Sequence, residues 1–301
     1  MTMIHLDLRI TIFILAWSVV STSIAAPNVG GLYPPGVQRG QDVQVTLGGQ
    51  RLTDPQDIVF YQPGIELIGL DANADNRITA HLRIAADCPV GQLPFRLCTA
   101  RGVSNLKTLG ISAYPCINEV EPEPGSEAAS GVDVPRMVTI RGVLKAEDED
   151  AFCVELSAGE PLSYEIEGLR HGRAEMDVEL EIVDPAGKVV ERCDDTPLTL
   201  HDPAGTYVAV TAGKHTVRLR EARRIGNDGF QYLLHLGRFP RPATGLPGGG
   251  RPGEVVKVTW LQEGRDAWHQ ETKLPEQFDE SYNVWAENEH GISPTPNAFR
   301  V

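Results

Sequence analysis

The sequence has no apolar run long enough to cross a membrane after its N-terminal segment. A membrane-spanning helix needs roughly 18 consecutive apolar residues, and no later stretch approaches that length. Basic residues are also scarce, because 27 Lys and Arg stand against 41 Asp and Glu, for a formal net charge of −14. Phosphate backbones select surfaces rich in Lys and Arg, so this balance disfavours nucleic acid as a partner.

The common motifs of catalytic sites are missing as well. The chain has no His-Glu-x-x-His, no Gly-x-Ser-x-Gly, no Walker loop and no Cys-x-x-Cys pair. Its eight histidines are scattered, and only His269 and His290 have acidic and aromatic neighbours. Catalytic groups are defined by their geometry, so spacing alone assigns neither histidine a catalytic role. We therefore expect a protein that is not an enzyme.

The cysteine count is odd, at five. Disulfides form in exported proteins, so at least one of these thiols must be free or bonded to another chain. Cys88 and Cys98 flank a strand-like segment and could face each other across a strand pair. Cys153 instead has the surroundings of a small buried hydrophobe.

The first 25 residues have the pattern of a secretory signal peptide. A short polar region ends at Arg9, an apolar run extends from Ile10 to Val20, and small residues continue to Ala26. The apolar run is too short for a membrane span, and cleavage is expected after Ala25. The mature protein is therefore expected to be exported, to the periplasm, the cell surface or the medium, with no transmembrane segment after cleavage.

The rest of the sequence predicts an all-β chain. Thirty Gly and 22 Pro interrupt short alternating runs such as "VQVTL", which are typical of strands in a β-sandwich. Gly48-Gly49 is interpreted as a turn after one such run. The segment Asp184–Gly187 ("DPAG") is interpreted as a hairpin turn, because Pro presets φ and Gly accepts a positive φ.

Three segments of different charge divide the mature chain. Residues 27–117 carry seven basic and seven acidic side chains, residues 118–240 carry 13 and 24, and residues 241–301 carry six and nine. We expect a β-sandwich in each segment. The start of the last one, "GLPGGGRPGEVVKVTW", is similar to "GLYPPGVQRGQDVQVTL" in the first. The last segment is therefore interpreted as a diverged copy with a shorter middle, and the chain as the front part of a longer array.

These motifs resemble two known families. "PPGVQRGQDVQVTLGGQRL", with the later "GVSN", resembles the immunoglobulin-like TIG type of domain. "EVEPE", "AEDEDAF", "VELEIVDPAGKVV" and "AGTYVAV" resemble the bacterial pre-peptidase C-terminal domain over most of residues 118–240. The resemblance implies an immunoglobulin-like sandwich, then a jelly-roll-like sandwich, then a second, partial immunoglobulin-like unit. Such domains accompany secreted peptidases and also occur in large exported proteins without one.

The acidic motifs of the middle segment form the candidate metal site. The resemblance assigns calcium to Glu119 and Glu121 of a Glu-x-Glu-Pro motif, and to Asp148 and Asp150 of an Asp-x-Asp-x-Phe motif, while Glu123 stands where the family has Asn. The three glutamates also share one side of an extended segment, where carboxylates repel unless a cation or water separates them. Calcium takes roughly six to eight oxygen ligands, which such carboxylates supply. Solvated acidic loops are the alternative interpretation.

Two further groups of residues are interpreted as structural. Asp177 and the pair Asp194-Asp195 lie next to predicted strands, and Asp is common in turns because it bonds its own backbone. A cation at Asp194-Asp195 is the less favoured alternative. Trp260, Trp268 and Trp285 gather in the last segment, where core packing of a small sandwich is favoured over an exposed platform for sugar rings.

The sequence as a whole predicts a non-catalytic exported protein that acts in binding, in adhesion or as a spacer, stabilised by calcium. The expected partner is an extracellular protein or a polysaccharide. The alternative function is that of an accessory region, for substrate binding or secretion, of a secreted peptidase or other hydrolase.

Overall fold

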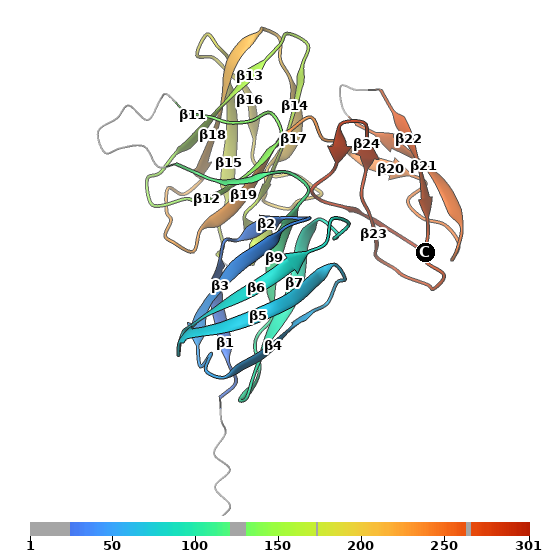
Figure 1. The fold of residues 1–301 in the computed structure, drawn as a ribbon. Coiled ribbons are helices and arrows are strands. Elements are labelled where there is room, and N and C mark those ends of the chain that lie inside the picture. The colour runs from blue at the N-terminus through green and yellow to red at the C-terminus, as the bar shows by residue number, and fades with distance from the viewer. Residues whose placement is uncertain (1–24, 121–130, 173, 263–265) are drawn as a thin grey trace, which may run out of the picture.

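The chain folds into β-sheets that form three units (Figure 1). The computed structural model describes residues 25–120, 131–172, 174–262 and 266–301, so the predicted signal peptide lies almost wholly outside the described residues. Within them the only helix is the short 3-10 helix η2 (Leu169–His171). The prediction of an all-β chain of tandem sandwiches is therefore confirmed. In the same residues no helix has the length and hydropathy that a membrane crossing requires.

The first unit packs one sheet, in the strand order β1-β3-β6-β5, against another, in the order β2-β9-β7-β4 with β8 beside β7. Side chains that alternate along these strands, such as Leu47, Leu82 and Leu97, form its buried core. The strands are β1 (Asn28–Tyr33), β2 (Gly36–Gln38), β3 (Asp42–Gln50), β4 (Pro55–Phe60), β5 (Ile65–Ala74), β6 (Arg77–Ile84), β7 (Gly91–Thr99), β8 (Gly102–Val103) and β9 (Lys107–Ser112).

Gly48-Gly49 does not form a turn, and that interpretation of the sequence is wrong. Both glycines continue β3, where they pair with Gly31 and Val29 of β1. A Cβ atom on Gly49 would lie 2.1 Å from the carbonyl oxygen of Asn28. Glycine is therefore required here because two strands approach each other closely, and not because the chain changes direction.

The cysteine pairing considered from the sequence is also wrong, because Cys88 and Cys98 are both free thiols. Cys88 is buried beside Pro63 before β7 begins, whereas Cys98 lies near the far end of that strand. The seven residue-to-residue steps from Gly91 to Cys98 span about 23 Å of extended chain, far beyond the reach of a disulfide. Cys153 is buried in β13, as expected for a small hydrophobe.

The middle unit packs the sheet β10-β12-β19-β14-β17 against the sheet β11-β13-β18-β15-β16. The core between them includes Tyr164, Leu180 and Tyr232, all fully buried. The strands are β10 (Cys116–Asn118), β11 (Val132–Asp133), β12 (Val138–Val143), β13 (Asp150–Leu156), β14 (Pro161–Glu167), β15 (Val178–Val183), β16 (Val189–Cys193), β17 (Ala204–Val208), β18 (Gly213–Glu221) and β19 (Gln231–Gly237).

The hairpin predicted at Asp184–Gly187 is confirmed. It joins β15 to β16, which pair antiparallel. Gly187 has a φ of +83°, which glycine adopts without strain. An Asp184 side-chain oxygen accepts the backbone N–H of Ala186 and of Lys188, both at 2.9 Å, and so closes the turn.

The third unit is smaller, with the sheets β20-β21-β22, β23-β26 and β24-β25 around the fully buried Trp260. Its strands are β20 (Thr244–Leu246), β21 (Val255–Leu261), β22 (Trp268–Lys273), β23 (Tyr282–Val284), β24 (Glu287–Asn288), β25 (Gly291–Ile292) and β26 (Asn297–Phe299). The antiparallel order β20-β21-β22 repeats that of β1-β3-β6 in the first unit. The domain boundaries after residues 117 and 240 stay a prediction.

A buried carboxylate on β14 connects the middle unit to the third. Glu165 is fully buried, and its carboxylate lies 3.3 Å from Arg170 Nη2 and 3.0 Å from Arg241 Nε. The hydroxyl of Thr295, in the third unit, donates a hydrogen bond to the same carboxylate. The Glu165 carboxylate thus faces two guanidinium groups, and Arg170 is also paired with the buried carboxylate of Asp202, so the charges balance.

A second buried carboxylate, two residues along β14, connects the middle unit to the first. Glu167 accepts a hydrogen bond from Gln92 Nε2 of β7 and lies 3.2 Å from His235 Nε2. The other nitrogen of His235 bonds Thr139 at 2.8 Å, and Thr139 bonds Ser112 of the first unit at 2.6 Å. Burial alone raises the pKa of Glu167, but the hydrogen bond and charge of His235 outweigh it and lower that pKa to about 2.

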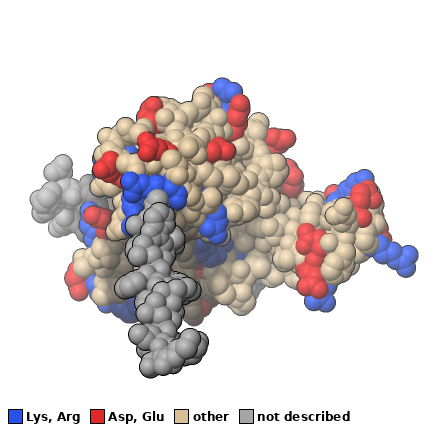
Figure 2. Space-filling view, turned by 90° about the horizontal axis from the view of Figure 1, so that it is seen from below, with Lys and Arg blue, Asp and Glu red and all other residues tan. Residues whose placement is uncertain are grey.

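The molecular surface carries charges of both signs side by side. On the face seen from below, Lys and Arg are interspersed with Asp and Glu over the units (Figure 2). Arg83, for example, lies 3.1 Å from Asp42 and 3.2 Å from Glu66. Neighbouring charges of opposite sign weaken each other's field at a distance.

We expect Glu165→Gln to destabilise the fold strongly. The amide leaves Arg241 without its charge partner and takes one of two carboxylates from Arg170, which keeps Asp202. Removing one partner of a buried pair costs about 3–5 kcal/mol. Urea unfolding followed by tryptophan fluorescence measures the loss. Asp42→Asn, which breaks an exposed pair with Arg83, is the control and should change little. Equal losses in the two variants would contradict the role of Glu165.

Candidate functional site

Two of the five predicted metal ligands come together in the structure. Glu119 follows β10, and Asp150 is the first residue of β13. The hydroxyl of Tyr232, on β19, lies 3.0 Å from a Glu119 oxygen and 2.6 Å from an Asp150 oxygen. The predicted ligands Glu121 and Glu123 lie outside the described residues.

Asp150 holds a proton more tightly than an ordinary carboxyl. Burial, and next the negative charge of Glu119, raise the pKa of Asp150 to about 8, although its hydrogen bond with Tyr232 works in the opposite direction. A tyrosine hydroxyl has one hydrogen to donate, so it cannot satisfy two ionised carboxylates at once. A proton on Asp150 resolves this conflict. A cation between the two carboxylates would resolve it as well.

Asp148 has a different role from Asp150. Its carboxylate accepts the backbone N–H of Lys145 at 3.3 Å and of Glu149 at 3.0 Å, which closes the turn before β13. Its charge helps to raise the pKa of Asp150, so it is near the pair. The calcium site at these residues stays a prediction.

A different group of residues has the geometry of a metal site. One ligand atom from each of Asp177, Asp195 and His201 lies within 4.8 Å of the other two. Asp195 and His201 are exposed and bond at 2.8 Å. The hydrogen bond and the charge of Asp195 raise the pKa of His201. Carboxylate and imidazole groups are common metal ligands, so this exposed group could hold an ion.

The sequence interpretation missed this group by treating its aspartates as separate turn residues. The predicted hairpin contained the signal, because residues equally far from its turn pair across the two strands. Leu180 pairs with Cys193 in the observed register. Counting outward from this pair places Val178 opposite Asp195, so Asp177 is one residue beyond that position, at the open end of the hairpin.

Asp150→Asn is expected to stabilise the protein at alkaline pH when divalent cations are removed. The folded pKa of about 8 exceeds the unfolded value of 3.8. Asp150 therefore costs nothing below about pH 4, and its ionisation destabilises the fold increasingly as the pH rises through about 8. An amide avoids this cost. Thermal unfolding in EDTA from about pH 4 to about pH 9 measures this. The midpoint of the variant should rise relative to that of wild type as the pH rises, and a difference between the two midpoints that does not change with pH would contradict the assignment.

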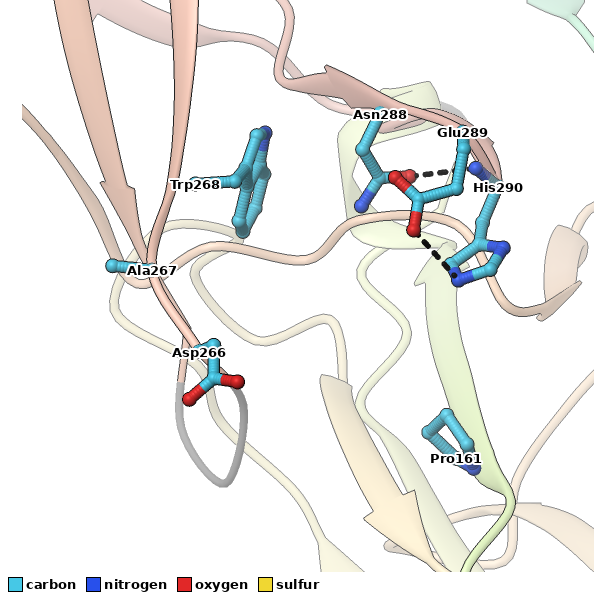
Figure 3. Close-up of a pocket in the computed structure, with 7 residues that line it drawn as sticks. All are labelled: Pro161, Asp266, Ala267, Trp268, Asn288, Glu289 and His290. Carbon is cyan, nitrogen blue, oxygen red and sulfur yellow. Dashed lines mark hydrogen bonds and ion pairs between the residues drawn. The ribbon is translucent and has the colours of Figure 1, made fainter.

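A pocket of about 770 Å³ opens beside the third unit (Figure 3). Trp268, at the start of β22, stands on one side, and three residues of the β24–β25 turn face it across the pocket. Pro161, at the start of β14, belongs to the middle unit and lies at the lower edge in this view. The lining residues are Pro161, Asp266, Ala267, Trp268, Asn288, Glu289 and His290.

The indole ring of Trp268 is fixed in place. Its Nε1 donates a hydrogen bond to the carbonyl oxygen of Glu287 at 3.0 Å, and its ring stacks beside Trp260 with 6.4 Å between centroids. The sequence favoured core packing for the three tryptophans, and Trp260 is indeed fully buried in the core of the third unit. Trp268 and Trp285 are only half-buried, and each lines a cavity.

The opposite side of the pocket is held by Tyr114, from the segment between β9 and β10. The Tyr114 hydroxyl donates to the Ile292 carbonyl at 2.5 Å and accepts from the Ile292 N–H at 3.0 Å. Its ring stacks on Phe239 with 5.7 Å between centroids. Gly291 has a φ of +128°, and a Cβ atom there would lie 2.6 Å from the same hydroxyl. The turn that carries His290 is therefore fitted closely to Tyr114.

Some of the polar groups that line the pocket bond one another. Asn288 Oδ1 accepts the N–H of His290 at 2.9 Å, and Glu289 lies 3.5 Å from His290 Nε2 (Figure 3). The amide nitrogen of Asn288 and the carboxylate of Asp266 make no hydrogen bond to any residue that the structure describes. The pocket thus offers a flat apolar ring together with hydrogen-bond donors and acceptors.

No family model matches this chain, and no curated protein matches it. Among solved structures, the chain is distantly similar to the pre-peptidase C-terminal domain of a collagenase from Bacillus anthracis, with 11% identity over 40% of this chain and 98% of that chain and a TM-score of 0.28. It is similar to PliG of Aeromonas hydrophila, a periplasmic inhibitor of g-type lysozyme, with 13% identity over 41% and 95% and a TM-score of 0.28. It is also similar to SGBP-B of Bacteroides ovatus in complex with a mixed-linkage heptasaccharide, with 12% identity over 70% and 52% and a TM-score of 0.26.

Proposed function

We propose that this is an exported, non-catalytic protein that binds an extracellular polysaccharide at the Trp268 pocket. The observation that carries the proposal is the half-buried indole of Trp268. It is fixed by Glu287 and faces a polar wall on the other side of a pocket with a volume of about 770 Å³. Small-molecule sites generally have volumes of roughly 300–1,000 Å³ and combine apolar surface with a few polar groups. The N-terminal signal-peptide pattern supports export.

The chemistry of the lining favours a sugar. The face of a pyranose ring carries C–H groups that pack on a flat aromatic ring, while its hydroxyl groups both donate and accept hydrogen bonds. Asn288 offers a free N–H donor, and Asp266 and Glu289 offer acceptors. Two carboxylates in the lining disfavour an acidic polymer, so the expected ligand is a neutral polysaccharide.

The pocket also supports binding without catalysis. A glycoside hydrolase needs a carboxylic acid that stays protonated, which is achieved by a buried, apolar environment. Asp266 and Glu289 are both exposed to solvent. We therefore expect no release of reducing sugar from any polysaccharide that the protein binds.

Trp268→Ala is expected to weaken polysaccharide binding by roughly tenfold or more, because aromatic anchors dominate binding sites of this kind. Affinity electrophoresis with xyloglucan, mixed-linkage glucan and amylopectin measures the loss. Phe278→Ala is the matched control, since Phe278 is an aromatic residue that is 71% exposed and lies outside the pocket. Unchanged retardation of Trp268→Ala would overturn the proposed site.

Calcium is the ion that we infer for the carboxylates at the start of the middle unit. Glu119 and Asp150 supply oxygen ligands, which calcium prefers, and both are anchored by strands on either side of the Tyr232 hydroxyl. A cation there would bind only the folded state, because unfolding separates the two carboxylates. Calcium would then stabilise the middle unit.

Millimolar calcium is expected to raise the thermal midpoint of the wild-type protein and to leave that of Asp150→Asn unchanged. Thermal unfolding in calcium and in chelator measures both. His201→Ala tests the alternative group at Asp177 and Asp195, and it should keep the calcium response of wild type. A response lost in His201→Ala and kept in Asp150→Asn would place the ion at the alternative group.

A further inference from the structure

A second cavity, of about 730 Å³, lies where the three units meet. Its walls belong to the first and third units, and two charged residues of the middle unit lie between them. The lining residues include Gln62, Glu167, Arg170, Tyr282, Asn283 and Trp285. None of them lines the Trp268 pocket.

The charges of the middle unit in this cavity are already neutralised by the protein. Arg170 Nε lies 2.7 Å from the buried carboxylate of Asp202, and the same guanidinium pairs with Glu165. Glu167 is held by Gln92 and His235. A ligand therefore need not carry charge, and an ion would have to compete with partners that are fixed in place.

The walls of the cavity present aromatic rings and unused polar groups. Tyr282 and Trp285 are half-buried on the wall of the third unit. The Nε1 of Trp285 is buried and has no hydrogen-bond partner among the residues that the structure describes. Gln62, on the first unit, and Asn283, on the third, are exposed, and neither side chain bonds any described residue. The exposed amides of Gln62 and Asn283 are therefore open to a ligand in the cavity.

We infer that this cavity is a second binding site, which takes a neutral saccharide independently of the Trp268 pocket. Aromatic rings receive the C–H face of a sugar, and amide side chains match hydroxyl groups because both kinds of group donate and accept hydrogen bonds. The site extends the proposed function, and it differs from the Trp268 pocket in being walled by two units. A saccharide that contacts Gln62 and Asn283 together links the first unit to the third.

The test begins with Trp268→Ala, which removes the first pocket, and uses cellohexaose and laminarihexaose as probes in calorimetric titration. We expect Trp268→Ala to retain one saccharide site for at least one of the two hexamers. Adding Gln62→Ala and Asn283→Ala should weaken this remaining site by roughly tenfold. Both residues are exposed and bond no described residue, so the fold should be unaffected. The matched control adds Gln56→Ala and Gln277→Ala, two exposed amides outside the cavity, and should leave the affinity unchanged.

The outcomes separate the two sites. Loss of all saccharide binding in Trp268→Ala would overturn the second site and support the proposed function. Equal affinity in the Gln62/Asn283 and control variants would also overturn the second site. Conversely, full binding in Trp268→Ala that falls with Gln62 and Asn283 would support the second site and overturn the first pocket.

Hydrogen exchange provides a readout that a general loss of stability cannot mimic. Because the walls belong to two units, a bound hexasaccharide should slow exchange at residues 62–64 and 281–285 together, and the effect should vanish in the Gln62/Asn283 variant. Protection of only one wall would contradict a ligand that bridges the units. Protection by an alanine-serine hexapeptide, and not by either hexasaccharide, would overturn the assignment to saccharides.

Discussion

The arrangement of the three units depends on two negative charges buried on one face of β14. Alternate residues of a strand face opposite sides, so Tyr164 and Ile166 enter the core of the middle sandwich while Glu165 and Glu167 face outward. In an isolated sandwich that outer face would meet water. Here the neighbouring units cover it, and each carboxylate must find a fixed partner, because an uncompensated buried charge is very unfavourable. Arg241 and His235 supply these partners.

Both cavities are lined by residues of more than one unit, so their shapes are a consequence of how the units are joined. The cavity walled by Gln62 and Asn283 exists only where the first and third units approach each other over Glu167. The Trp268 pocket includes Pro161 of the middle unit, and Tyr114 holds its far side. Binding sites at unit boundaries are common, because the surfaces of two bodies form a concave space that neither has alone.

The sequence predicts those features that depend on residues close together along the chain. Alternating apolar runs identify the strands, and "DPAG" identifies a hairpin, because each is decided within a few residues. The contacts of Glu165 and Glu167 with the neighbouring units could not be predicted in this way. The stretch "SYEIEG" has the same alternation of polar and apolar residues whether its polar face meets water or another unit. Gly48-Gly49 was misread for the same reason, because the need for glycine comes from Asn28 on a neighbouring strand. Likewise Trp260, Trp268 and Trp285 are chemically alike, and only the fold separates the core ring from those that line cavities.

The residues expected to bind calcium come from two acidic motifs that the family resemblance identifies, and the structure brings Glu119 and Asp150 of these motifs together. What the sequence could not indicate is the role of Tyr232, a core residue whose hydroxyl reaches both Glu119 and Asp150. With one hydrogen available between two carboxylates, the site needs a second positive partner, and a proton on Asp150 supplies it at neutral pH because burial raises its pKa to about 8. A divalent cation bound as we propose would compete for the same place. Ion binding should therefore release this proton and become stronger as the pH rises, which connects the stability of the middle unit to both the ion and the acidity of its surroundings.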